Sequence, residues 1–483
     1  MKAQEPASLR FLWTALILAG VLLITHALAD WAWAASFRGL GYLPGGGLPS
    51  YANGVSADGQ VVVGRAESPY GTQAFMWTAA GGMVPLGDTS GGYVESVAEA
   101  VSRDGSVIVG YQRGGEAFRW TAGTGIVGLG DLPGGPSSST ANGVSGDGSI
   151  VIGSGGTDAG REAFRWTQTT GLVGLGDLPG GYFDSEASAI STDGRVIVGR
   201  ALSAASKEPF MWTADGGMVG LGDLNGGGVE GEAYGVSTDG TVIVGYGSSA
   251  MGTEAFRWTA ESGMVGLGIL PGGRYSAAKA VSADGSVIVG YSETFFQSQS
   301  EAFIWDAAHG MRHLADVLSN DFGLGAELAG WTLYDARGIS ADGMVIAGIG
   351  GGPNGDEAWI ADLRPAPLAV AIDIQPGSTT NRINLKKGGP VPVAILSSAQ
   401  FDAPAQVDRT SLTFGRTGDE ASLTSCNRRA KDVNSDGLSD LVCSFSTAAS
   451  GFQAGDTEGV LKGRTVSDVS IIGSDSVTII TGK

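Results

Sequence analysis

The segment from Asp432 to Asp440 is the part of this 483-residue chain whose residue types and spacing point most directly to chemistry. Oxygen-bearing side chains stand at its first, third, fifth and ninth positions (Asp432, Asn434, Asp436 and Asp440), with glycine at the sixth. Leu438, at the seventh, would offer its backbone carbonyl. Carboxylate, amide and carbonyl oxygens are the ligands that calcium prefers, and alternate spacing turns them toward one point. The sequence therefore predicts that these residues bind Ca²⁺.

The twelfth position of this loop departs from the pattern of an EF-hand. Cys443 stands where a bidentate Glu is expected, and a strand-like run follows in place of a helix. The loop resembles the calcium loops of dockerins and thrombospondin-type repeats, which implies an extracellular module and a dissociation constant of about 10⁻⁴–10⁻³ M. A loop closed by Asx turns without a metal is the alternative. Asp456 is a further candidate ligand.

Cys443 and Cys426 are the only two cysteines of the chain. In an exported protein a disulfide between them would staple the end of the chain. Two separate buried thiols are the alternative.

Signals for catalysis are weak. His309 and His313 could share a metal only on a helix, and Gly310 and the strand-like pattern around it argue against a helix. Carboxylates are abundant, which leaves a glycosidase-type pair open. The Glu that recurs before Ala-Phe is interpreted as structural, because one active site does not need five copies. These copies are Glu116, Glu162, Glu254, Glu301 and Glu357. We therefore predict that the chain is not an enzyme.

Most of the chain is a repeat that must position any such site. A Phe/Trp strand followed by a Gly-rich turn recurs seven times between Phe37 and Asp362, with tryptophans 43 to 54 residues apart. A period of this size is typical of an array of small sheets. We expect the indole of each repeat to be wedged into the core of its sector. The tryptophans are Trp77, Trp120, Trp166, Trp212, Trp258, Trp305 and Trp359.

Each repeat divides into four short strand-like pieces. In the third repeat these are residues 125–130, 141–145, 149–153 and 162–167, rich in β-branched or aromatic types and bounded by Gly, Pro or Asp. Four strands in about 45 residues make one blade. The sequence therefore predicts an all-β fold with a seven-bladed β-propeller over residues 37–363.

An Asp-Gly pair stands between the second and third strand-like pieces of every repeat. Such a pair suits a tight hairpin that needs positive φ. Metal ligation by these aspartates is the alternative, but every copy lies between two strand-like runs, which favours turns. The pairs begin at Asp58, Asp104, Asp147, Asp193, Asp239, Asp284 and Asp342.

Three motifs make the repeat resemble the HAF family of extracellular repeat proteins. They are Glu-Ala-Phe-Arg-Trp-Thr (residues 116–121), Leu-Gly-Asp-Leu-Pro-Gly-Gly (129–135) and Val-Ser-Ala-Asp-Gly-Ser-Val-Ile-Val-Gly (281–290). The resemblance covers residues 37–362. It implies a secreted bacterial propeller, more distantly similar to kelch arrays, and brings no defined activity. The chain departs from the family where the usual His before Ala-Phe is Glu or Gln, or Pro at Pro209.

One face of the predicted ring differs most between repeats. In an up-and-down blade, the loops between strands one and two and between strands three and four share a face. These loops vary strongly and carry aromatic residues, whereas the Asp-Gly turns of the other face are uniform. Sequence freedom on a fixed scaffold is how folds acquire binding sites. We predict that a ligand binds there, with plain loop drift as the alternative. The candidates are Tyr70, Tyr93, Tyr182, Phe183, Phe295 and Phe296.

The first 34 residues differ from the rest. Lys2 and Arg10 precede an apolar run over residues 11–24, and small-x-small sites follow at 27–29 and 32–34. This pattern is typical of a secretory signal peptide. An uncut membrane anchor is the alternative, although the run is shorter than the ~20 residues of a span.

The repeat stops near the end of the chain. Residues 364–367 (Arg-Pro-Ala-Pro) read as a stiff linker. Short strand-like runs alternate over residues 368–483, which predicts a small β-sandwich-like domain that carries the calcium loop.

The formal net charge of −20 repels phosphate backbones and argues against nucleic-acid binding, whereas it suits Ca²⁺. We predict a bacterial protein that is secreted or on the cell surface, with the periplasm as an alternative. It is expected to be a monomer that binds an extracellular glycan or protein and meets a membrane only through an uncut leader. A carbohydrate-active hydrolase or lyase using carboxylates of the variable face is the second hypothesis, and a passive envelope component the third.

Overall fold

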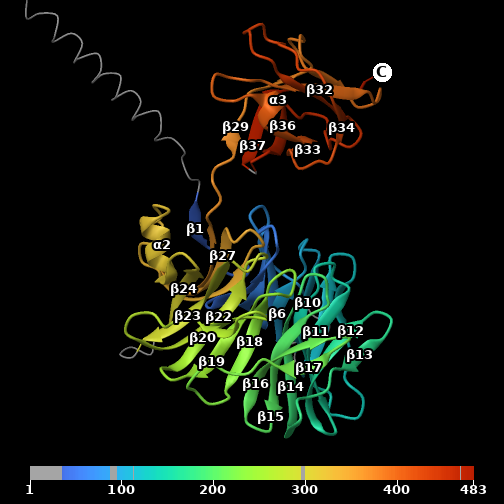
Figure 1. Ribbon diagram of the computed structural model, residues 1–483. Coiled ribbons are helices and arrows are strands. Elements are labelled where there is room, and N and C mark those ends of the chain that lie inside the picture. The colour runs from blue at the N-terminus through green and yellow to red at the C-terminus, as the bar shows by residue number, and fades with distance from the viewer. Residues whose placement is uncertain (1–34, 88–94, 113, 295–299, 468, 483) are drawn as a thin grey trace, which may run out of the picture. The chain divides into compact units, whose positions relative to one another are not determined.

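The computed structural model describes residues 35–87, 95–112, 114–294, 300–467 and 469–482. The predicted leader therefore lies outside the described residues. The described chain divides into two compact units, Ala35–Arg364 and the part from Pro365 onward, and each is described by itself (Figure 1). None of the helices in the described ranges has the length and apolar character needed to cross a bilayer.

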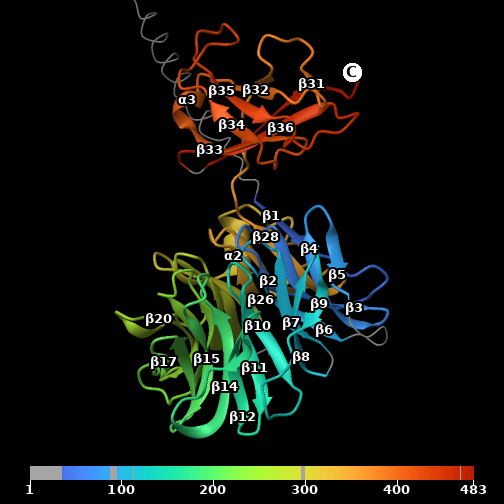
Figure 2. The same ribbon diagram turned by 90° about the vertical axis from the view of Figure 1, so that its right-hand side faces the viewer.

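The first unit is a seven-bladed β-propeller, as the repeat predicts (Figure 1, Figure 2). Each blade is a four-stranded antiparallel sheet, whose strands we name A to D from the channel outward. The A strands are β2 (Ser50–Val55), β6 (Ser96–Val101), β10 (Ser139–Val144), β14 (Gly180–Ile190), β18 (Gly231–Val236), β22 (Gly273–Val281) and β26 (Thr332–Ile339). Each A strand contacts the A strands of both neighbouring blades, and β26 contacts β2, so the ring is closed.

The outer strands complete the blades. The B strands are β3 (Val61–Ser68), β7 (Val107–Gln112), β11 (Ile150–Thr157), β15 (Ile197–Ser203), β19 (Ile243–Ser249), β23 (Val287–Thr294) and β27 (Val345–Gly352). The C strands are β4 (Gly71–Thr78), β8 (Glu116–Thr121), β12 (Gly160–Thr167), β16 (Lys207–Thr213), β20 (Gly252–Thr259), β24 (Ser300–Asp306) and β28 (Gly355–Asp362). The D strands are β5 (Gly82–Pro85), β9 (Gly125–Gly128), β13 (Gly171–Gly174), β17 (Gly217–Gly220), β21 (Gly263–Gly266), β25 (Gly310–His313) and β1 (Ser36–Gly39).

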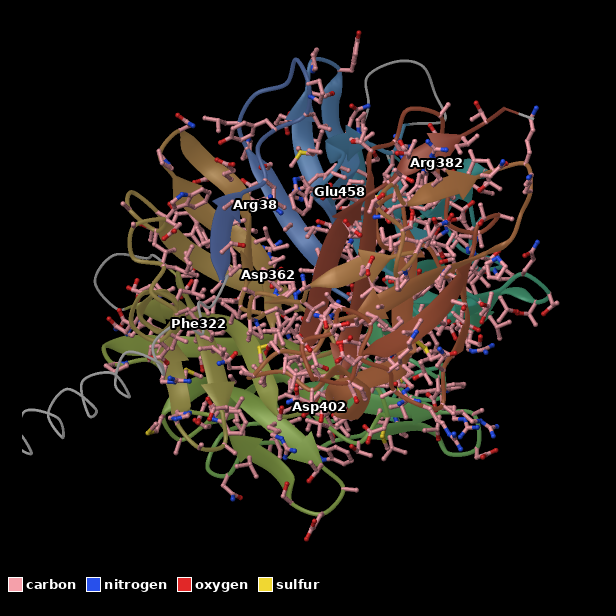
Figure 3. All side chains as sticks on the ribbon, turned by 90° about the horizontal axis from the view of Figure 1, so that it is seen from above. Arg38, Phe322, Asp362, Arg382, Asp402 and Glu458 are labelled. Carbon is pink, nitrogen blue, oxygen red and sulfur yellow. A yellow bond between two sulfur atoms is a disulfide. The ribbon has the colours of Figure 1, made fainter. Side chains whose placement is uncertain are left out.

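The last blade takes its D strand from the start of the described chain. β1 pairs antiparallel with β28, with Ser36 opposite Asp362 (Figure 3 shows Arg38 and Asp362 on these adjoining strands). Phe37 of β1 is buried against Trp331 and Trp359, with ring centroids 5.1 and 5.9 Å away. The strand that seems to open the first repeat therefore closes the seventh blade.

A belt of hydrogen bonds runs around the ring through the turns between A and B strands. The amide of Ala57 donates to the carbonyl of Arg103 (3.1 Å), and the next turns continue in the same sense as far as Thr192. Thr192 and Thr238 meet through their hydroxyls at 3.2 Å. The belt ends where the amide of Ala341 donates to Ala57 at 2.9 Å. Every blade is thereby tied to both of its neighbours.

The core of each blade is centred on a phenylalanine. Phe75, Phe118, Phe164, Phe210, Phe256 and Phe303 are fully buried, and Trp359 takes this position in the last blade. The expectation of an indole wedge in every sector is wrong for the middle blades, where tryptophans such as Trp120 and Trp166 are only half-buried. These tryptophans stand two residues further along the C strand. Trp359 pairs with Gly348 as Phe118 pairs with Gly110, so it belongs to the phenylalanine series.

The Asp-Gly pairs form the A–B turns, as predicted. In the third blade, the Ser145 hydroxyl donates to Asp147 Oδ1 (2.6 Å) and accepts the amide of Ile150 (3.0 Å). Gly148 follows with φ +71°, which a side chain would oppose. The hydrogen bond from the Ser145 hydroxyl and further bonds from Ser149 lower the pKa of Asp147 to about 2. The corresponding serine also lowers the aspartate pKa in four other blades.

The Glu before Ala-Phe supports the connection between blades. Glu162, Glu254 and Glu357 accept the backbone amides of Gly176, Gly268 and Gly41 at 3.0, 2.8 and 2.8 Å. These glycines begin the D–A connections. In these three copies the carboxylate thus has the structural role that was expected of all five, whereas Glu301 pairs with His313 and Glu116 accepts from Gln112.

Every A strand contains a β-bulge just before its end. In the third blade the register shifts between Ala141 and Gly143, which leaves Asn142 as the extra residue. The same shift occurs in the other six blades. A glycine stands opposite on each B strand, and a Cβ on Gly153 would overlap the carbonyl oxygen of Thr140. The glycine that all seven B strands share at this position is therefore required by the close approach of the A strand.

The connection between the sixth and seventh blades is the longest. It contains the helix α2 (Leu314–Asn320), which follows β25. Leu314, Val317 and Leu318 are buried against the last two blades. A short helix therefore forms part of the longest connection of the propeller.

The second unit contains two four-stranded sheets and a two-stranded one around a single core. The first sheet has the order β29 (Leu368–Ala369), β37 (Ser470–Ser476), β36 (Glu458–Thr465) and β33 (Val407–Gly415). The second has the order β30 (Ile372–Ile374), β32 (Pro390–Ile395), β35 (Leu441–Ser446) and β34 (Leu423–Cys426). β31 (Arg382–Asn384) pairs with β38 (Thr478–Ile480), and α3 (Ala403–Gln406) precedes β33. Two sheets on one core make the expected sandwich-like domain.

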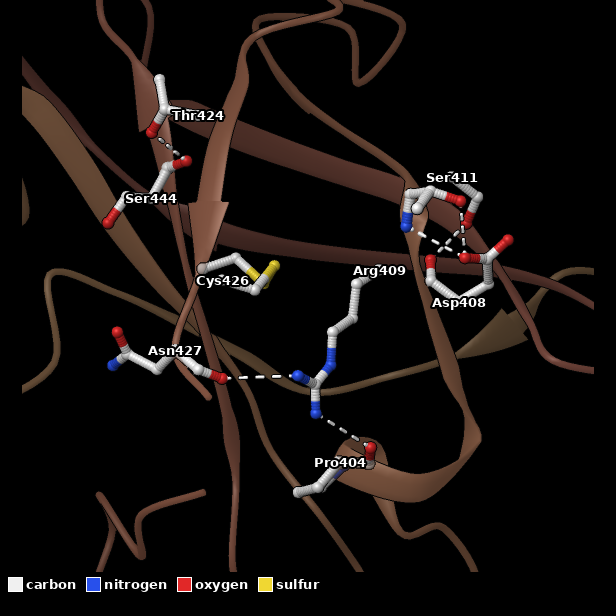
Figure 4. The surroundings of a disulfide bond; sticks show 10 residues. Pro404, Asp408, Arg409, Ser411, Thr424, Cys426, Asn427 and Ser444 are labelled. Carbon is white, nitrogen blue, oxygen red and sulfur yellow. Dashed lines mark hydrogen bonds between the residues drawn. A yellow bond between two sulfur atoms is a disulfide. The ribbon is translucent and has the colours of Figure 1, made fainter. Parts of the chain in front are cut away.

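A disulfide joins Cys426 to Cys443, as the cysteine count suggested. The two residues are directly opposite each other on β34 and β35. Arg409 lies beside them and donates to the carbonyls of Asn427 (3.5 Å) and Pro404 (3.3 Å) (Figure 4). The disulfide ties the edge strand β34, which leads into the Asp432–Asp440 loop, to β35.

The serine–aspartate turns predict a loss of stability in acid. Because the folded pKa of Asp147 lies near 2, below the ordinary 3.8, its contribution is complete above about pH 4 and is lost as the pH falls toward 2. Ser145→Ala should lower the free energy of unfolding by about 1–3 kcal/mol at pH 6, since the buried amide of Ile150 loses its acceptor. Urea unfolding at pH 6, 4 and 2.5 measures both effects.

Ser149→Ala is the matched control for this change. Ser149 donates to the same Asp147 but is exposed, so a change of at most about 0.5 kcal/mol is expected. Equal effects of the two substitutions, or stability that does not fall between pH 4 and 2.5, would contradict the role given to the buried serine.

The bulges predict a sharp difference between two glycines. Gly153→Ala should lower the free energy of unfolding by about 3 kcal/mol or more, because the new methyl group overlaps backbone of the A strand. Gly123→Ala, in a C–D turn where a Cβ meets no atom within 4 Å, should change it by less than about 1 kcal/mol. Thermal and urea unfolding of the two variants gives the comparison; a tolerated Gly153→Ala would refute the bulge constraint.

Candidate functional site

The bulges bring seven polar side chains to the centre of the propeller. Each is the extra residue of its A strand, between a preceding Ala and a following Gly or Ala. A bulge re-aims the side chain at its position, and here all seven line one hollow. They are Asn53, Glu99, Asn142, Ser188, Tyr234, Lys279 and Arg337. We call this set the polar ring.

A second ring lies beneath the polar ring, two residues further along each A strand. It consists only of β-branched residues: Val55, Val101, Val144, Ile190, Val236, Val281 and Ile339. This apolar girdle lines both the hollow of the polar ring, about 220 Å³, and a second hollow of about 160 Å³ beside the A–B turns. The upper hollow is therefore a cup with a polar wall and an apolar floor.

The cup belongs to the face that the sequence analysis marks as variable. The A strands enter it from the D–A connections, and the B strands leave toward the B–C connections. In the repeat defined from the sequence, strand one is the D strand of the preceding blade, and strands two, three and four are the A, B and C strands. The D–A and B–C connections are therefore the predicted loops between strands one and two and between strands three and four. The uniform A–B turns lie at the opposite end of the channel.

Ion pairs line one arc of the mouth, over blades 3 to 5. Glu186 pairs with Arg161 (2.8 Å) and with Arg200 (2.9 Å). Arg200 also reaches Glu232 of the next blade, with Nε 3.9 Å from the carboxylate. Burial, followed by the negative charge of Glu186, raises the pKa of Glu232. Lys207 adds a second cation 3.9 Å from Glu232.

Tyrosines occupy the next arc, over blades 5 and 6. Tyr234, Tyr246, Tyr275 and Tyr291 follow one another with ring centroids 5.6, 5.9 and 5.6 Å apart. Burial is the main cause that raises the pKa of Tyr234 and Tyr275, so both are neutral donors. The Nζ of Lys279 lies 3.6 Å from the ring centre of Tyr234, a cation–π contact.

A third arc runs over blades 7 and 1. Arg337 donates to Asp335 (2.8 Å) and, across the blade boundary, to Asn53 (2.9 Å). Asn53 in turn donates to the carbonyl of Ala98 at 3.0 Å. The other oxygen of Asp335, Oδ1, is buried and has no hydrogen-bond partner in the described ranges. Glu99 follows in blade 2, and burial raises its pKa.

Three of the predicted ligand-face aromatics are described, and they lie in blades 1 and 4. Tyr70 is 66% exposed in the B–C turn of blade 1, and Tyr182 is 88% exposed at the start of β14. Phe183 beside it is partly buried. The other three candidates, Tyr93, Phe295 and Phe296, lie outside the described residues.

The sequence contains a pattern that indicates the cup, but it lies in the A strands and is not found by comparing the loops of the repeats. At one position of the uniform motif Ala-x-Gly/Ala-Val/Ile, the repeats carry Asn, Glu, Asn, Ser, Tyr, Lys and Arg. Variation at a single position inside an otherwise constant strand marks a side chain that the scaffold does not use.

The predicted calcium loop closes on its own backbone. Asp432 accepts the amides of Ser435 (2.7 Å) and Gly437 (2.9 Å). Asp436 accepts the amide of Leu438 at 2.8 Å, and the Asn434 amide donates to its other oxygen at 2.9 Å. These side chains and the Leu438 carbonyl thus belong to one exposed turn.

Asp440, at the base of the loop, is fully buried. Its oxygens accept the amides of Ser397 (2.8 Å) and Val433 (2.9 Å). In the described part of the chain, no three His, Cys, Asp or Glu side chains are gathered as metal ligands. Each carboxylate oxygen has a second lone pair, so these residues offer the kind of oxygen donors that calcium prefers. Asp456 is engaged elsewhere, with Arg416 at 3.4 Å.

The two histidines face separate carboxylates. His309 Nδ1 lies 2.8 Å from Asp306, and His313 Nδ1 lies 2.7 Å from Glu301. The segment between them is the strand β25, as the sequence indicated, so the helical spacing that a shared metal would need is not present.

Comparison with known proteins finds only remote structural likenesses. No protein-family model matches the chain, and no curated protein matches its sequence. Among solved structures, TolB from Acinetobacter baumannii is 12% identical, with a TM-score of 0.38 over 61% of this chain and 76% of that one. An oligogalacturonate lyase from Vibrio parahaemolyticus is 10% identical, with a TM-score of 0.44 over 68% of this chain and 96% of that one. Likenesses this low carry no argument about ligand or activity.

Proposed function

We propose that the chain is an exported, non-enzymatic binding protein whose propeller takes its ligand at the cup on the variable face. The single observation that carries the proposal is the polar ring: seven bulges of one design present a mixed set of side chains above a uniform apolar girdle. A scaffold keeps its structural positions constant. Freedom at the one position that faces an open hollow is therefore best explained by recognition.

The ligand class proposed is a glycan or a protein of the cell envelope. Tyrosines, carboxylates and guanidinium groups around one mouth suit hydroxyl-rich or charged surfaces, and each can donate or accept without a metal. The leader pattern and the resemblance to HAF repeats support export, to the cell surface, the medium or the periplasm. The acidic composition supports a partner other than nucleic acid.

A carbohydrate-active hydrolase or lyase is the second candidate. The observation that favours it is the pair Glu186 and Glu232 at the mouth, because a carboxyl group with a raised pKa can act as a general acid. Turnover separates the two functions. Under the binding hypothesis, a retained glycan is recovered unchanged after prolonged incubation.

Blocking the cup tests the binding function. Ser188→Trp places an indole among the polar ring, and we expect it to reduce retention on glycan arrays or envelope fractions at least about tenfold. Gln168→Trp is the matched control, because Gln168 is exposed in a C–D turn of the opposite face. The protein used is the full mature chain, and every hit is also assayed for product.

Equal retention by both variants would contradict a site in the cup. Product formation that Glu232→Gln abolishes would replace the binding function with the enzymatic one.

The C-terminal domain is proposed to be stabilised by calcium in the Asp432–Asp440 loop. Asp432, Asn434, Asp436 and the Leu438 carbonyl would hold the ion, and Asp440 would complete the set from the base. The ion would neutralise carboxylates that the exposed turn holds close together.

Calcium removal gives the corresponding prediction. At 10 mM Ca²⁺ and a dissociation constant of about 10⁻⁴–10⁻³ M, binding adds about 1.4–2.7 kcal/mol to the domain. Calorimetric scans of the full chain should show its transition fall in temperature with chelator. Asp432→Asn should abolish the shift, whereas Asp408→Asn, on β33 of the same domain and outside the loop, should keep it. A transition insensitive to calcium in the unmodified chain would refute the proposal.

A further inference from the structure

Two oppositely charged side chains line the cup without pairing with each other. Glu99 stands on β6 in blade 2 and Lys279 on β22 in blade 6. Around the closed ring, three blade steps separate them by the shorter way, so they face each other across the channel. They are near enough to interact electrostatically, yet no ion pair joins them.

Their neighbours in the polar ring are satisfied, and these two are not. Arg337 is bound to Asp335 and Asn53, and Asn142 donates to Glu186 (3.2 Å) and to the carbonyl of Ala187 (2.9 Å). In the described ranges, the Glu99 carboxylate has no hydrogen-bond or ion-pair partner. Among the described residues, the Lys279 ammonium contacts the faces of Tyr234 and Tyr291, with ring centres at 3.6 and 5.5 Å.

Leaving both charges unpaired is costly. Burial is the main cause that raises the pKa of Glu99 and lowers that of Lys279, although opposite charges nearby, Arg337 for Glu99 and Asp335 for Lys279, act in the other direction. Neither group serves the scaffold, because other blades carry Asn or Ser at the same position. Both side chains are partly buried, and unpaired charges that line a hollow are typical of ligand sites.

We propose that the cup binds a small zwitterion whose ammonium group pairs with Glu99 and whose carboxylate pairs with Lys279. This inference rests on the proposed binding function and names the ligand class of the same site. The hollow of about 220 Å³ has the room of roughly seven water molecules at ~30 Å³ each, which suits a group of amino-acid size. The apolar girdle below would receive the methylene groups.

A series of ω-amino acids tests which separation of ammonium and carboxylate groups the site prefers. Glycine, β-alanine, 4-aminobutanoate and 6-aminohexanoate carry the same two charges at growing separation. Titration calorimetry with the full mature chain should show one best length. Butanoate and butylammonium, which carry one charge each, should bind at least about thirtyfold more weakly than the best zwitterion. Equal binding of zwitterions and single ions, or binding of none of the probes at millimolar concentration, would overturn the proposal.

Two isosteric variants test the assignment of the charges. Glu99→Gln and Lys279→Met should each weaken the best zwitterion about thirtyfold or more. They should also raise the melting temperature, because an uncompensated buried charge is removed. Glu261→Gln, exposed in a C–D turn, and Lys386→Met, exposed in the C-terminal domain, are controls that should change neither. Unchanged affinity, or a lower melting temperature in both cup variants, would show a structural role and contradict the proposal.

The outcomes separate this inference from the binding function. If Ser188→Trp abolishes retention of a glycan or protein while no zwitterion binds, the cup remains a binding site and the ligand class proposed here is wrong. If zwitterions bind and Ser188→Trp blocks their binding, the binding function and the zwitterion proposal are both supported.

Discussion

Closure of the ring is the constraint on which the rest of the propeller depends. Seven blades must meet with no gap, and two devices achieve this: β1 completes the last blade, and the A–B turns hydrogen-bond from blade to blade around the channel. The serine–aspartate pair holds each turn in the shape that this belt needs. Because the turns fix the ends of the A strands, the bulges that precede these turns present their side chains to a common centre.

The propeller separates structure from recognition within single strands. Ala, Gly and β-branched residues of the A and B strands are repeated because they pack, approach backbone or form the girdle. The bulge residue alone has none of these structural roles, because its side chain points away from the sheet. A cup of mixed charge can therefore change without disturbing the fold, and a pair such as Glu99 and Lys279 can persist despite its cost.

Much of the fold could be predicted from local chemistry. The blade number follows from the period, the turns from Asp-Gly, and the disulfide from two cysteines in a chain expected to be exported. The prediction of an indole in the core of every blade was wrong because Phe118 and Trp120 lie on the same face of their strand. The sequence spacing does not say which of the two is more deeply buried. The cup was missed because a bulge breaks the alternation of a strand, so the side that Asn142 faces cannot be read from parity.

Hydrogen exchange of the A–B turn amides tests the closed ring most directly. In a closed ring, the turns that contain Ala57, Arg103, Gly146, Thr238, Ala283 and Ala341 are equivalent, and no blade is an end. The account predicts that these amides exchange together, at the slowest rate of the propeller, with the first and last blades as protected as the middle ones. Markedly faster exchange at Ala57 and Ala341 than at Gly146, as in an open array that frays from its ends, would contradict it.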